Sequence, residues 1–204
     1  MIVKLGIAIV VLLALAASVT LNTYLMLDLP EPKITTSGTA AIGGPFTLVA
    51  TNGEIVSDQT FRGKWLLIYF GYTYCPDACP TALNSMSVAL EKLGSPAKDL
   101  QPLFITVDPE RDTRETMAKY LTSFDSRIIG LTGTKEQIES VIKEYRLYVS
   151  REKPEQGGDD YVISHSSYIY LMDPQGRFAN VIHAEEHGDE IAIRLRKEMA
   201  YAGR

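Results

Sequence analysis

The sequence predicts an α/β sandwich with a central mixed β-sheet, preceded by one N-terminal transmembrane helix. Three observations lead to this prediction. Short continuous apolar runs have the length of strands buried on both faces. Helical patterns with capping residues lie between these runs. Two further strand-like segments near the C-terminus are joined by a tight turn, which adds an antiparallel edge.

The N-terminal segment has no charged residue from Leu5 to Leu27, between Lys4 and Asp28. As a helix it would span roughly 35 Å, enough to cross the ~30 Å apolar core of a bilayer. Positive charge at the N-terminal side predicts a cytoplasmic start and an exported C-terminal domain. We therefore expect residues 1–29 to be a membrane anchor. A cleaved signal peptide is the alternative, since 14–17 offers a small-residue cleavage site.

Residues 30–45 are rich in Pro, Gly, Thr and Ser and are expected to be a tether, which leaves 46–204 as the folded domain. The whole chain is 46% hydrophobic and 22% charged, as in ordinary globular proteins. A net charge of −5 without a basic stretch argues against nucleic acid as a partner. Two cysteines allow at most one internal disulfide.

The strands and helices of the domain follow in order. The apolar runs are expected to be buried strands: Trp65–Phe70, Leu103–Val107 and Ile128–Leu131. A helical face follows Pro80 and ends at Gly94, and two capping boxes predict the next helices, Asp112 with Glu115 and Thr134 with Gln137. Tyr161–Met172 and Phe178–Ile182 are expected to form a hairpin through the turn 173–176, before a closing helix over 191–202.

Cys75 and Cys79 lie where a buried strand gives way to a helix. The backbone N–H groups of a helix start favour anions, so thiolate should be populated there. Thiolate serves both disulfide exchange and metal ligation. If that turn is helical, the C-x-x-x-C spacing puts both sulfurs on the same face, where a cation can sit between them. The spacing is also compatible with a disulfide or with two buried, inert side chains.

Three histidines are the candidates for a further ligand. His165 begins the first hairpin strand and is either a core residue or a ligand. His183 and His187 are expected to be solvated residues before the last helix. A structural zinc site is disfavoured, because 103 residues separate Cys79 from His183. Asp108, Arg111 and Asp112 are expected to form a strand-to-helix turn with a cap and an ion pair.

Several motifs in order resemble the Sco/SenC family of membrane-anchored copper proteins, which have a thioredoxin-like fold. The resemblance runs from Gly43 to about Phe178 and rests on these stretches: Gly43–Leu48, Phe61–Lys64, Phe70–Tyr72, Cys75–Pro80, Val107–Thr113, His165–Ser166, Tyr170–Leu171 and Asp173–Gly176. One departure is Ser164, where family members usually carry Asp before the histidine. That difference bears on exchange kinetics more than on ligand identity.

The resemblance implies that Cys75, Cys79 and His165 bind one copper ion, as Cu(I) with Cu(II) also to be considered. Soft thiolates with one imidazole suit Cu(I). The implied function is a copper metallochaperone that delivers the ion to the dinuclear copper centre of cytochrome c oxidase. The implied partners are the oxidase subunit with that centre, a periplasmic copper donor and a thioredoxin-like reductant. The implied location is the inner membrane, with the soluble domain in the periplasm.

Other functions remain open for the same cysteines. A thiol–disulfide reductase would keep the copper-binding cysteines of the oxidase reduced, and a redox or copper sensor would use the same pair. A general oxidoreductase is disfavoured, since no proline lies between Pro154 and Pro174, where thioredoxin-like enzymes usually place a cis-proline. A peroxidase is disfavoured as well. Peroxiredoxin-type sites resemble P-x-x-x-T-x-x-C, with the Thr three residues before the Cys, whereas Thr73 is only two residues before Cys75.

Overall fold

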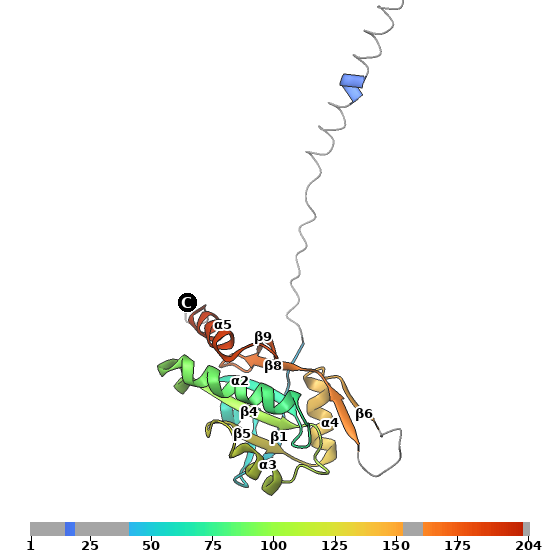
Figure 1. The fold of residues 1–204 in the computed structure, drawn as a ribbon, viewed down its shortest axis with the longest axis vertical. Helices are drawn as coiled ribbons and strands as arrows, with labels where there is room; N and C mark the ends of the chain where they lie inside the picture. Colours follow the sequence, from blue (N-terminus) through green and yellow to red (C-terminus); the bar gives the residue numbers. More distant parts are fainter. Residues whose placement is uncertain (1–14, 19–40, 153–160, 202–204) are drawn as a thin grey trace, which may run out of the picture. The chain divides into compact units, whose positions relative to one another are not determined.

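The computed structural model describes residues 15–18, 41–152 and 161–201. Within them, a seven-stranded mixed sheet is flanked by helices, and a two-stranded ladder stands apart from it (Figure 1). The elements, with η for 3₁₀ helices, are β1 (Thr47–Ala50), β2 (Ile55–Ser57), η1 (Asp58–Phe61), β3 (Trp65–Gly71), α2 (Ala78–Leu93), η2 (Ser95–Asp99), β4 (Leu100–Thr106), α3 (Arg114–Leu121), β5 (Ile129–Thr132), α4 (Lys135–Glu144), β6 (Val149–Glu152), β7 (Val162–His165), β8 (Tyr168–Met172), β9 (Phe178–His183) and α5 (Gly188–Tyr201).

The central sheet has the strand order β2-β1-β5-β4-β3-β8-β9. Its three middle strands β5, β4 and β3 are parallel, while β8 and β9 form an antiparallel edge. This arrangement confirms the predicted mixed sheet. The second antiparallel edge, β1 with β2, was not predicted, because these strands are only four and three residues long.

The core lies around β3, all seven residues of which are buried. This explains why the segment is a continuous apolar run, since a central strand covered on both faces has no solvent side. Helices α2 and α5 lie against each other (Figure 1). Gly188 permits this close approach, because a Cβ there would lie 2.7 Å from the carbonyl oxygen of Ser85.

Two local predictions were wrong. Asp112 does not cap α3; Thr113 does, with its side chain accepting a hydrogen bond from the backbone N–H of Thr116. The expected single strand 161–172 is two strands, because Ser166 bonds to Tyr148 beside β6 whereas Tyr168 pairs with β9. The capping box of Thr134 with Gln137 is confirmed.

The predicted membrane anchor lies outside the described residues except for 15–18, which are helical. Most of the predicted tether also lies outside them. In the described part of the chain, no helix has both the length and the apolar character needed to cross a membrane.

Gly71 ends β3 beside Cys79 of α2 and Phe104 of β4. A Cβ at this residue would lie 2.6 Å from Cys79 Sγ and 3.0 Å from the ring of Phe104. We expect Gly71→Ala to lower the free energy of unfolding by about 1–3 kcal/mol through overpacking. Denaturant titration of the two proteins measures this. An unchanged free energy of unfolding would show that the sulfur has room to move.

Candidate metal centre

Cys75, Cys79 and His165 come together in space, although Cys79 and His165 are 86 positions apart in the chain. One ligand atom from each lies within 4.8 Å of the others, and Cys79 Sγ is 3.6 Å from His165 Nε2. In the ranges that the structure describes, this is the one such group of three potential ligands. His183 and His187 are not part of it; His183 is exposed and its ring packs against Tyr168.

The two cysteines are positioned by the start of α2. Cys75 lies in the loop after β3, and Cys79 lies in the first turn of the helix. The backbone N–H of Cys79 points at Cys75 Sγ at 3.4 Å. This is the anion-favouring helix start that the sequence predicts, with a sulfur as the acceptor. Cys79 is fully buried, whereas Cys75 is half-buried.

The cysteine loop is fixed to the end of β4 by Asp112, which is fully buried. Its carboxylate accepts hydrogen bonds from the backbone N–H of Thr73 at 3.0 Å, from Thr73 Oγ1 at 2.6 Å and from Thr106 Oγ1 at 2.7 Å. Burial raises the pKa of Asp112, and these hydrogen bonds oppose that rise. The sequence pattern suggested a helix cap, and only the folded structure reveals this loop-holding role.

The last residue of β7, His165, has a defined tautomer. Its Nδ1 lies 3.0 Å from the carbonyl oxygen of Ser166. A carbonyl only accepts, so Nδ1 carries the proton and Nε2 presents a lone pair toward Cys79. The rings of Tyr69 and Tyr72 pack edge-on against the imidazole, with centroids 6.1 and 6.0 Å away. The imidazole is therefore held in the orientation that a ligand needs.

Sequence reasoning did not identify Tyr69 and Tyr72 as parts of the site. The Tyr69 hydroxyl lies 3.9 Å from Cys79 Sγ, and burial raises the pKa of this phenol, so it stays protonated. The Tyr72 hydroxyl accepts from the backbone N–H of Ile163 at 3.2 Å. The available signal was position, since both lie at the carboxyl end of the strand that leads into the cysteines.

The surroundings of the two thiols shift their pKa values in opposite directions. The hydrogen bond from the Cys79 thiol lowers the pKa of Cys75 to about 4, although burial opposes the shift. The same hydrogen bond to Cys75, together with burial, raises the pKa of Cys79. Cys75 is therefore the thiolate of the pair, and Cys79 holds its proton until a metal ion displaces it or a base removes it.

The three ligand atoms suit a soft ion in trigonal coordination. With bonds of about 2.0–2.3 Å, as for Zn²⁺, trigonal ligand atoms lie about 3.5–4.0 Å apart. The 3.6 Å from Cys79 Sγ to His165 Nε2 falls in this range. Two thiolates and one imidazole favour Cu(I) by softness, and a tetrahedral Zn²⁺ site would need a fourth ligand.

Comparisons with known proteins point to one family. A family model described as SCO1/SenC matches residues 34–200. The human protein SCO1 homolog, mitochondrial, is 40% identical over 164 residues, which cover 79% of this chain and 54% of the human one. The chain spans about half the length of several curated relatives, from human, mouse and Arabidopsis thaliana.

Solved structures show the same fold. The structure of Bradyrhizobium japonicum ScoI with copper bound is 44% identical, has a TM-score of 0.72, and the match covers 78% of this chain and 99% of that one. BsSco, described as a member of the Sco family of cytochrome c oxidase assembly proteins with a disulfide switch, is 25% identical. Its TM-score is 0.63, and the match covers 79% of this chain and 95% of BsSco. The fold is thus thioredoxin-like.

The unequal thiols predict unequal alkylation of the reduced protein. With limiting iodoacetamide at pH 6, we expect Cys75 to be modified first and Cys79 only after unfolding, because Cys75 is accessible and ionised. The rate at Cys75 should stay level from pH 8 to pH 6 and fall only as the pH approaches about 4. Peptide mass spectrometry measures both sites.

The denatured protein is the control, in which both cysteines should react alike. An ordinary thiol with a pKa of about 8.5 loses about tenfold in rate per pH unit below that value. Such a decline at Cys75 in the folded protein would contradict the assigned electrostatics.

Proposed function

The chain belongs to the SCO1/SenC family, and on that premise we propose that it is a copper metallochaperone for cytochrome c oxidase. It binds one copper ion through Cys75, Cys79 and His165 and delivers it to the dinuclear copper centre of the oxidase. The observation that carries this proposal is the convergence of two thiols and one imidazole on a single point. The copper-bound relative of the same fold supports the identity of the ion.

Binding of Cu(I) uses the features already built into the site. The Cys75 thiolate and the Nε2 lone pair of His165 are available before the ion arrives, while Cys79 gives up its proton on ligation. The family resemblance supports this set of ligands. Ser164, in place of the usual family Asp, donates a hydrogen bond to Glu152 at 3.0 Å, so a carboxylate still lies beside the histidine strand.

Release uses the half-exposed side of the centre. Cys75 and His165 are both partly accessible, whereas Cys79 is buried beneath them. An incoming thiolate of the recipient adds to the ion from that side, and one of the two accessible ligands leaves. Further recipient ligands replace the other two in the same way, and Cys79 takes up a proton from solvent as its sulfur leaves the ion. The copper keeps its oxidation state in this exchange. The recipient is the oxidase subunit with the dinuclear centre, and the similarity to BsSco, from a family of cytochrome c oxidase assembly proteins, supports this choice.

A thiol–disulfide reductase is the second candidate function. It is favoured by the division between an accessible thiolate at Cys75 and a protonated, buried thiol at Cys79. In this reaction Cys75 attacks a substrate disulfide, and Cys79 then resolves the mixed disulfide, so that the Cys75–Cys79 pair is oxidised and the substrate is reduced. The disulfide switch of BsSco supports such a redox change in the family, for reduction or for sensing.

The two functions differ in their need for His165. Disulfide exchange uses only the two sulfurs, whereas a two-thiolate site would leave Cu(I) open to competing ligands. We expect His165→Ala to keep a reducible Cys75–Cys79 disulfide but to weaken Cu(I) binding more than roughly 100-fold. Removing a residue that only hydrogen-bonds to a ligand typically lowers metal affinity about 10- to 100-fold, and removing the ligand itself should lower it further. Competition with a Cu(I) chelator and redox titration measure the two properties.

The matched controls are His183→Ala and His187→Ala, which should bind Cu(I) as the native protein does. Oxidase activity in membranes of a deletion strain completes the test. If His165→Ala restores full oxidase activity there, the chaperone function is wrong and the reductase takes its place.

The proposal includes a location. Residues 1–29 anchor the chain in the inner membrane, 30–45 form a tether, and 46–204 face the periplasm, where a copper donor and a thioredoxin-like reductant would reach the site. The support is the uncharged run Leu5–Leu27 with Lys4 on its N-terminal side.

Reporter fusions joined after Pro45 test the orientation. They should be active only in the exported compartment, and the protein should stay in the membrane pellet after carbonate washing. A mature N-terminus near Ala17 in a soluble extract would instead establish a cleaved signal peptide.

A further inference from the structure

The candidate metal centre is assembled from two parts of the molecule. The cysteines belong to the loop and helix that follow β3, within the central sheet. His165 belongs to the hairpin β6–β7, which pairs only with itself and is not a member of that sheet. Two residues, Ser166 and Ser167, join β7 to β8 of the central sheet, so the distance from imidazole to sulfur depends on this short link and on the contacts that hold the hairpin against the body.

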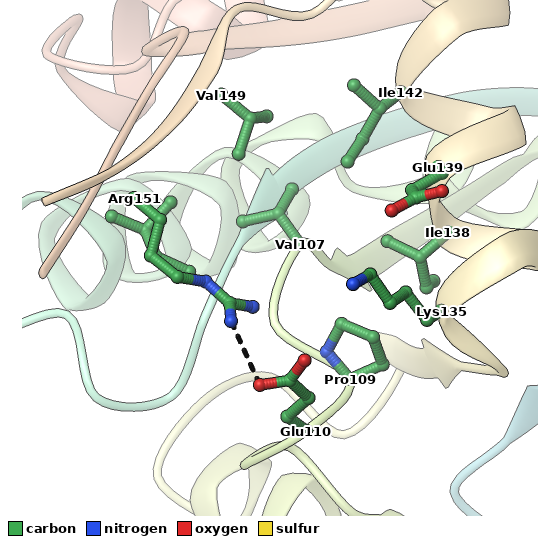
Figure 2. Close-up of a pocket in the computed structure, with 10 residues that line it drawn as sticks. Val107, Pro109, Glu110, Lys135, Ile138, Glu139, Ile142, Val149 and Arg151 are labelled. Carbon is green, nitrogen blue, oxygen red and sulfur yellow. Dashed lines mark hydrogen bonds and ion pairs between the residues drawn. The ribbon is translucent and has the colours of Figure 1, made fainter. Parts of the chain in front are cut away.

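Apolar packing covers only part of the hairpin β6–β7. A cavity of about 410 Å³ separates β6 from α4, with Val149 facing Ile142 across it (Figure 2). Its wall includes Ile163 of β7 and Val107 at the end of β4. Because this side of the hairpin is hollow, polar contacts must contribute much of its placement.

Arg111, in the loop between β4 and α3, supplies such contacts to both parts. Its guanidinium lies 3.7 Å from the ring centroid of Tyr161, next to β7, and donates from Nη1 to the Tyr161 carbonyl oxygen at 3.0 Å. The same guanidinium lies 4.9 Å from the ring centroid of Tyr74 and 5.6 Å from that of Tyr72, in the cysteine loop. It is thus layered between the hairpin and the cysteine loop.

Asp108 completes the junction that Arg111 forms between the hairpin and the cysteine loop. Its fully buried carboxylate accepts hydrogen bonds from Arg111 Nε and, at 2.6 Å, from the Tyr161 hydroxyl. Burial, with the bond to Asp108, raises the pKa of Tyr161 to about 12, so the phenol keeps the proton that it donates. Arg151 of β6 adds an ion pair to Glu110 at 2.9 Å (Figure 2).

Burying the Arg111 guanidinium here also has an unfavourable free-energy term. Among the described residues, Arg111 Nη2 is buried without a hydrogen-bond partner. A buried, unsatisfied donor on a charged group is unfavourable by about 1–3 kcal/mol or more. An apolar residue would avoid that cost, but neither an apolar residue nor a lysine has the planar fork that reaches Asp108 and the Tyr161 carbonyl together.

We propose that Arg111 is a positioning residue that fixes the His165 hairpin against the cysteine loop and so sets the imidazole-to-sulfur distance. This inference deepens the proposed function and rests on it for the metal. Arg111 does not contact the ion. It acts through His165, by way of Tyr161 and β7 on one side and Tyr72 and Tyr74 on the other.

The test compares Arg111→Lys with Arg114→Lys, in which an exposed arginine three residues further is changed in the same way. We expect Arg111→Lys to weaken Cu(I) binding about tenfold or more, as measured by chelator competition. In the copper-free protein, the imidazole NMR signals of His165 should shift or broaden, while those of His183 and His187 stay in place. Arg114→Lys should change neither property.

A double-variant cycle identifies the route. If Arg111 acts through the histidine, Arg111→Lys has no further effect on Cu(I) affinity in a His165→Ala background. An equal loss in both backgrounds would overturn the proposal, because it would place the effect on the cysteines. Native-like affinity with unmoved His165 signals would also overturn it.

Two further measurements keep the test decisive. If Arg111→Lys fails to fold, Arg111→Gln takes its place, since its shorter amide side chain also lacks the fork that reaches Asp108 and the Tyr161 carbonyl together; the His165 signals should again move, and unmoved signals would overturn the proposal. If the native protein binds no Cu(I), the proposed function fails, and the imidazole signals of the copper-free variants alone decide whether Arg111 positions His165.

Discussion

The hydrogen bonds of the buried Asp112 carboxylate are the interaction on which the rest of the site depends. They tie Thr73, in the cysteine loop, to Thr106 at the end of β4. A buried carboxylate without donors would be too unfavourable to retain, so the loop has one arrangement that satisfies it. That arrangement brings Cys75 to the N-terminal end of α2, where the backbone N–H of Cys79 meets its sulfur. The electrostatic difference between the two thiols follows from this placement.

The two ends of the β4–α3 loop have complementary roles. Asp112 fixes the cysteine loop, and Asp108, through Arg111 and Tyr161, reaches the hairpin that carries His165. A single short segment therefore connects all three candidate ligands to the parallel core of the sheet. The cysteine side is packed tightly, as the crowding around Gly71 demonstrates. The histidine side borders a cavity and relies more on polar contacts. The centre thus joins a tightly packed half to a half whose placement relies on a few polar side chains.

Metal binding and disulfide chemistry draw on the same physical preparation of the sulfurs. A thiolate at Cys75 is both a soft ligand and a nucleophile, and a buried thiol at Cys79 is both a second ligand and a resolving group. What distinguishes the two chemistries is the imidazole. Its proton on Nδ1 is directed to the Ser166 carbonyl, which leaves Nε2 as a lone-pair donor 3.6 Å from Cys79 Sγ. Disulfide exchange has no use for that orientation, whereas a metal ion does.

Local patterns in the sequence determined the parallel core strands, the helix that starts at the cysteines and the antiparallel edge β8–β9, because apolar runs, caps and turns act over a few residues. The ligand set was implied by the family resemblance, since spacing alone left His165 between core residue and ligand. Tertiary structure decided the rest. The break at Ser166 arises because Tyr148 competes for its hydrogen bonds, and Asp112 bonds to Thr73, 39 residues away, in place of capping a helix. Such contacts depend on which loops the folded sheet brings together, and no local pattern records that choice.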